Sequence, residues 1–194
     1  GFRNIYKGEP EWIYSLRKES WESYNGQPLP ERVTNIWRYT KPEYFFAKES
    51  QTFMETLPPT SGRSNGDKHP LSDKYSAIGY NHIGGATFVK TAPELMESGV
   101  IFRDISSAVG QYEHLAGRFL GRLVGHNFGK FEAYNMAIWN TGFMIHVPDN
   151  TIIEKPILLN RHPAGVFTAA RLLAVIGKNS QVTIIDDYSG AGRD

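Results

Sequence analysis

The sequence predicts an α+β amino-terminal region followed by a carboxy-terminal region built from short β-strands. Apolar residues recur at helical spacing in several segments before residue 142. Beyond it, this periodicity gives way to short β-rich runs separated by turn residues. The length of 194 residues fits one domain or slightly more, and we place the boundary between regions 1–129 and 130–194.

The first helix is expected between Pro10 and Gly26. A first helical turn tolerates proline, and glycine often follows a helix end. The next prolines and the aromatic run 37–40 predict an extended or turn-rich connector. Residues 57–76 are rich in Pro, Gly, Ser and Asn and predict a flexible surface loop.

Short strands and short helices are expected between residues 75 and 142. Residues 75–89 predict two strands joined by a tight turn. Thr91 and Glu94 match a capping box for a helix that ends at Gly99, and Asp104 can cap the next helix. Two further helices follow from apolar residues at helical spacing, namely Leu115, Phe119 and Leu123 in one, and Phe131, Tyr134 and Ile138 in the other.

Four β-rich runs make up the remainder of the chain, at residues 143–147, 157–159, 171–176 and 182–185. Short strands without intervening helices fit a sandwich, a barrel or a β-solenoid, and periodicity does not separate these folds. Because no capping sequence follows the last run, we expect the chain to be a piece of a longer protein.

Composition excludes several classes of function. The net charge of +1 gives no general field to attract nucleic acid or an anionic membrane. With no cysteine, this segment has no disulfide, thiolate nucleophile or iron–sulfur thiolate ligand. No secretory signal and no apolar run of about 20 residues is present. We therefore expect a cytoplasmic protein.

No catalytic, cofactor-binding or metal-binding residue is predicted in this segment. The histidines lack metal-ligand spacing and are read as surface or packing residues: His69, His82, His114, His126, His146 and His162. His146 is the most interesting, because it shares a strand face with Met144. Asp186 and Asp187 lie on opposite strand faces and are read as solvated strand ends. With Glu154, Lys155 and Arg171 they would form a charged patch only across neighbouring coils.

Taken together, the motifs resemble the SufB/SufD family, the scaffold proteins of the Suf iron–sulfur cluster assembly system. The similarity covers most of the chain and rests on the order and spacing of several short elements. They are Glu9-Pro10-Glu11-Trp12 with Arg17, Leu29-Pro30, Ile36-Trp37-Arg38-Tyr39-Thr40, Gly99-Val100-Ile101-Phe102 with Ala108-Val109, Lys130-Phe131-Glu132-Ala133-Tyr134-Asn135, Val147-Pro148, Glu154-Lys155-Pro156-Ile157, and the run from Val182 to Gly190.

This resemblance implies that the carboxy-terminal region begins a right-handed parallel β-helix, a type of solenoid. It implies a non-catalytic scaffold whose full-length form binds a SufC-type ABC ATPase and a SufB/SufD-type sister subunit. An iron–sulfur cluster would belong to the full complex, with its ligands beyond Asp194. The Trp37-Arg38-Tyr39-Thr40 element and the absence of cysteine make SufD the closer likeness.

A second hypothesis is a polysaccharide-active β-helix enzyme, a lyase or hydrolase. In such an enzyme, carboxylates and basic residues from adjacent coils gather on one face of the solenoid. The candidate residues are Asp186, Asp187, Glu154 and Arg171. Enzymes of this kind are usually secreted, whereas this sequence shows no secretory signal.

Overall fold

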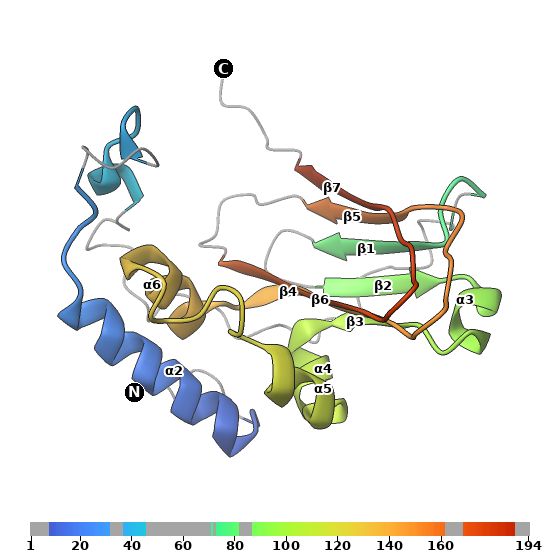
Figure 1. Cartoon of the computed structure of the whole chain (residues 1–194), viewed down its shortest axis with the longest axis horizontal. Coiled ribbons are helices and arrows are strands. Elements are labelled where there is room, and N and C mark those ends of the chain that lie inside the picture. Colours follow the sequence, from blue (N-terminus) through green and yellow to red (C-terminus); the bar gives the residue numbers. More distant parts are fainter. Residues whose placement is uncertain are drawn as a thin grey trace.

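The computed structural model of the chain describes residues 8–31, 37–45, 71, 73–81, 87–161 and 169–188. Helix α2 (Glu11–Gly26) packs against helix α6 (Lys130–Ile138), and the two helices lie together beside two β-sheets (Figure 1). Both helices were predicted, although α6 ends before Trp139 and the next strand already begins at Thr141. A short 3₁₀ helix, η2 (Pro42–Phe45), lies in the predicted connector.

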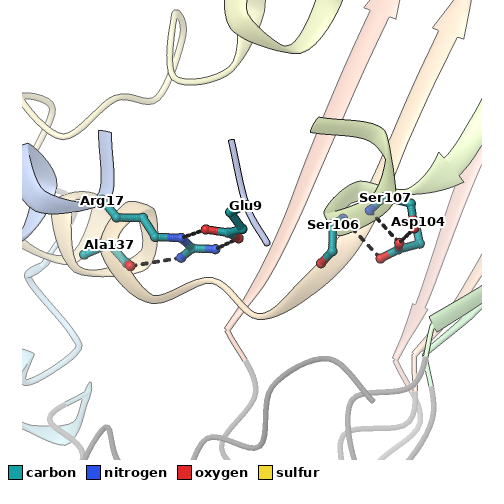
Figure 2. Close-up of polar contacts among 6 residues, drawn as sticks. All are labelled: Glu9, Arg17, Asp104, Ser106, Ser107 and Ala137. Carbon is teal, nitrogen blue, oxygen red and sulfur yellow. Dashed lines mark hydrogen bonds and ion pairs between the residues drawn. The ribbon is translucent and has the colours of Figure 1, made fainter. Parts of the chain in front are cut away.

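A buried arginine ties α2 to the end of α6. Arg17 is only 1% exposed, and its Nε and Nη2 atoms donate hydrogen bonds of 2.8 and 2.7 Å to the carboxylate of Glu9 (Figure 2). Its Nη1 atom donates to the carbonyl of Ala137 at 3.0 Å. The guanidinium also lies 4.1 Å from the ring centroid of Trp139. Charge, hydrogen bonding and ring contact thus fix the packing of the two helices.

Asp104 caps a helix, as the sequence predicts. Its carboxylate accepts hydrogen bonds from the backbone N–H groups of Ser106 and Ser107, at 3.2 and 2.8 Å, at the start of α4 (Ile105–Gln111; Figure 2). The next helix, α5 (Glu113–Phe119), is shorter than predicted. Leu123 lies outside it and is 90% exposed, so its placement on the helix face was wrong. Gly121, at φ 79°, has left the helical conformation.

The predicted capping box at Thr91 is also wrong. Thr91 is the last residue of strand β2 (Thr87–Thr91), and the helix α3 (Pro93–Glu97) begins after Ala92 with no side-chain cap. Since Thr91 is paired with Ala77 in a sheet, its hydroxyl is not at the helix entrance. The helix does end at Gly99, whose φ of 80° fits the left-handed conformation that follows many helices.

The strands form two sheets with mixed pairing. One has the order β2-β1-β5-β7, and the other has the order β3-β4-β6. The pairs β1–β2 and β3–β4 are antiparallel, whereas β1–β5, β5–β7 and β4–β6 are parallel. The remaining bounds are β1 (Ala77–Asn81), β3 (Ile101–Asp104), β4 (Thr141–Val147), β5 (Ile157–Arg161), β6 (Ala170–Ile176) and β7 (Ile184–Tyr188). The predicted hairpin and the four carboxy-terminal strands are therefore present, with the last one shifted towards Tyr188.

The segment after α6 passes twice through the same path. Thr141 pairs with Ala170 and Ile152 with Gln181, so that residues 29 apart lie side by side. The same repetition places β5 against β7, as Figure 1 shows. A right-handed parallel β-helix remains a prediction, and this parallel repetition is the arrangement that stacked coils require.

The corners of the two passes also stack. Asn150 and Asn179 both have left-handed backbone conformations, with φ of 57° and 56°. The Nδ2 atom of Asn179 donates to Oδ1 of Asn150 at 3.3 Å, and the backbone N–H of Lys178 donates to Asp149 Oδ1 at 2.7 Å. Asparagine tolerates this conformation better than most residues. Identical residues at equivalent corners thus hold the two turns in register.

Two apolar clusters form the core, and each draws residues from both sides of residue 130. The first joins Ile13 and Ile105 to Trp139 and Met144, between the helices and the β3-β4-β6 sheet. The second lies between the two sheets and includes Ala77, Phe102, Phe143, Ile145 and Leu159. The predicted division between regions 1–129 and 130–194 is therefore one of sequence pattern, and packing is continuous across it. Most of the predicted loop 57–76 lies outside the described residues.

Candidate functional site

The most informative surface is formed by the outer edges of β6 and β7, which we call the open edges. In the described part of the chain, no strand pairs with the far side of either. The other end of each sheet is closed differently, because β3 runs antiparallel to β4 and β2 runs antiparallel to β1. Unpaired strand edges present backbone donors and acceptors and can accept a further strand.

A buried ion pair lies beside the open edge of β7. Arg161 is 2% exposed, and its Nε and Nη2 atoms donate to the carboxylate of Asp186 at 2.6 and 3.3 Å. Its guanidinium lies 5.3 Å from the ring centroids of both Phe143 and Tyr188. The Nη1 atom is buried without a hydrogen-bond partner among the described residues. The charge is thus held between two rings and one carboxylate.

The four residues of the predicted charged patch have separate surroundings. Asp186 pairs with Arg161, while Asp187 is exposed and aligned with Asn160 on the opposite strand face. Glu154 lies in the turn before β5 and borders a different pocket. The prediction that Asp186 and Asp187 lie on opposite faces is confirmed, and Asp186 is better described as an ion-pair partner than as a solvated strand end.

Arg171 faces the helices instead of the other patch residues. Its Nη1 atom donates to Asn135 Oδ1 at 2.9 Å, and its Nη2 atom donates to the carbonyl of Val124. Burial lowers the pKa of Arg171 to about 10, which still leaves it charged at neutral pH. The side chain therefore anchors the segment after α5 to strand β6.

His146 is a packed histidine in the middle of a sheet. It aligns with Ile101 of β3 and Val175 of β6, and its Nδ1 atom is buried without a partner among the described residues. Burial lowers the pKa of His146, the neighbouring His114 lowers it further, and Asp149 acts in the opposite direction. In the parts of the chain that the structure describes, no group of His, Asp and Glu is placed to hold a metal ion. His69, His82 and His162 lie outside those parts.

Sequence reasoning missed the two buried arginines and a groove beside α2. Strand alternation places Arg161 on the same face as Ile157 and Leu159, but only the sheet partner shows that Asp186 meets it. The Glu9–Arg17 pair was noted only as part of a motif. No helix among the described residues is long and apolar enough to cross a bilayer.

A family model described as the SufBD protein N-terminal region matches residues 3–159. The chain belongs to the SufBD family. The predicted resemblance to SufB/SufD proteins is thereby confirmed at the level of the family.

Curated relatives of this SufBD chain carry a consistent description. It is 26% identical over 184 residues to an iron–sulfur cluster assembly SufBD family protein of Staphylococcus aureus (strain USA300). The identity is also 26% over 184 residues to the protein of that description from Staphylococcus haemolyticus (strain JCSC1435). Each alignment covers 87% of this chain and 38% of the relative. The chain therefore spans less than half the length of the curated relatives it matches.

Proposed function

We propose that this chain is the amino-terminal part of a non-catalytic scaffold subunit of the Suf iron–sulfur cluster assembly complex. Family membership carries the proposal, since the relatives are described as iron–sulfur cluster assembly proteins. Within the family, the Trp37-Arg38-Tyr39-Thr40 element and the lack of cysteine favour a SufD-like subunit. The second hypothesis, a polysaccharide-active enzyme, loses its motivation because its four candidate residues do not gather.

The open edges support a scaffold built from stacked coils. Parallel pairing of residues 29 apart and the Asn150–Asn179 contact are the local arrangement of two coils of a parallel β-helix. We propose that further coils of the full-length protein add to β6 and β7 with the same pairing. The antiparallel strands at the other end would close the solenoid there, because their edges run against the coil direction.

The ionic groups beside the open edges support a structural role for this part of the protein. The carboxylate of Asp186 is engaged by Arg161, so it is poorly placed to act as an acid or base on a substrate. A segment without cysteine supplies no thiolate to iron. We therefore place the cluster-building chemistry in the remainder of the protein and in its partners, a SufC-type ABC ATPase and a SufB/SufD-type sister subunit, acting in the cytoplasm.

An anaerobic affinity pull-down of the full-length protein from its native cells tests this proposal, with mass-spectrometric identification of partners and an iron assay. We expect an ABC-type ATPase and a cysteine-bearing homologue to be recovered together with iron. The tagged 194-residue chain alone is the matched control, and it should recover neither ATPase nor iron. Recovery of the full-length protein alone, without iron, would refute the scaffold role.

A further inference from the structure

An open groove of about 730 Å³ lies between α2 and the segment 120–128 that follows α5. We call it the α2 groove. Trp12, Leu16 and Leu120 line it. Leu123 and Phe128 also line it, and they are 90% and 66% exposed. Exposed apolar side chains around one concave surface are typical of a protein interaction site.

The exposed residues are held in place from several directions. Ser23 and Gln27, at the end of α2, both donate to the carbonyl of His126 at 2.8 Å. Arg171 of β6 donates to the carbonyl of Val124. The segment is thus fixed by side chains from α2 and β6, and the exposure of Leu123 and Phe128 is a property of an ordered surface.

Charges of opposite sign border the α2 groove. Glu19 comes from α2, and Arg122 comes from the segment opposite. Both are exposed, and no ion pair joins them to each other or to a third residue in the described part of the chain. An anionic membrane or a nucleic acid would be attracted by one wall and repelled by the other. A surface with an apolar centre and one charge of each sign is complementary to itself under a two-fold rotation.

We propose that the α2 groove is a two-fold interface with a second copy of this chain. The Leu123 and Phe128 side chains of one copy enter the groove of the other, and Glu19 of each copy faces Arg122 of its partner. This interface is distinct from the open edges, which lie on β6 and β7. It therefore goes beyond the proposed scaffold function and does not depend on it.

Sedimentation velocity of the full-length protein over a range of concentrations tests the interface. Phe128→Asp should weaken self-association about tenfold or more, since it places a charge at the apolar centre. Ile152→Asp is the matched control, because Ile152 is 69% exposed and lies outside the α2 groove. The control should dimerise like the unchanged protein. Circular dichroism melting should show that both variants remain folded.

A charge-reversal cycle makes the test specific to the proposed geometry. Glu19→Arg and Arg122→Glu should each weaken the dimer about two- to fivefold, and the double variant should restore it. A protein that stays monomeric at about 100 μM, well above the Kd of typical specific contacts, would overturn the proposal. A dimer that none of these substitutions changes would also overturn it. Because Phe128→Asp leaves the open edges intact, recovery of ATPase and iron in the pull-down reports separately on the scaffold role.

Discussion

Replacing Arg17 by alanine is expected to destabilise the protein by about 3 kcal/mol. The change removes two hydrogen bonds to Glu9 and one to the carbonyl of Ala137. Removing one partner of a buried ion pair costs about 3–5 kcal/mol, because the other charge is left without a partner. We take the lower end because the Glu9 side chain is 13% exposed and gains some hydration.

Urea unfolding followed by circular dichroism measures this effect, and thermal melting provides a second reading. For a chain of this size, about 3 kcal/mol corresponds to a fall in Tm of roughly 6–12 °C. Lys18→Ala is the neighbouring control, since the Lys18 side chain is 63% exposed and 3.9 Å from Glu22. It should change stability by less than about 0.5 kcal/mol. A loss below about 1 kcal/mol for Arg17→Ala would refute the view that this arginine fixes α2 on α6.

Three further results are expected. Gly142→Ala should abolish stable pairing of β4 with β6, because Gly142 has φ 140° and an added Cβ would lie 1.8 Å from a backbone oxygen of β6, whereas Gly110→Ala in α4 meets nothing within 4 Å and should stabilise by about 0.5–1 kcal/mol in the same unfolding assay. Asp104→Ala should cost about 1 kcal/mol through loss of the cap on α4, whereas Thr91→Ala should cost nothing because its buried hydroxyl has no partner among the described residues; a larger loss at Thr91 would restore the capping box. Since the pKa of His146 is lowered in the folded state, the unfolded chain binds its proton first as pH falls below about 6.5, so stability should decline there, and His146→Gln should flatten that part of a stability–pH profile.

Local signals in the sequence predicted the local features of the fold. Asp104 caps a helix because its carboxylate reaches N–H groups two and three residues away, and all the groups concerned are adjacent in sequence. Gly99 ends a helix for an equally local reason. The error at Thr91 came from competition, because the same residue completes a strand whose partner, Ala77, is not adjacent to it.

Non-local features of the candidate site could not be predicted in the same way. Strand alternation predicted that Asp186 and Asp187 face opposite sides, but the ion pair with Arg161 depends on how β5 and β7 are aligned. Arg171 was grouped with the acidic residues because the assignment of strands to sheets is invisible in periodicity. It belongs to β6, in the other sheet, where it binds Asn135.

The tie between Arg17 and Ala137 also has a consequence for synthesis. The two residues are 120 positions apart, so α2 leaves the ribosome long before the helix that covers it exists. At about 5–20 residues per second, the delay is roughly 6–24 s. During that time Ile13, which is fully buried in the finished structure, has no partner helix to pack against. The nascent chain therefore exposes an amphipathic helix to chaperones and proteases until α6 is translated, and slowing translation before residue 130 should lengthen that exposure.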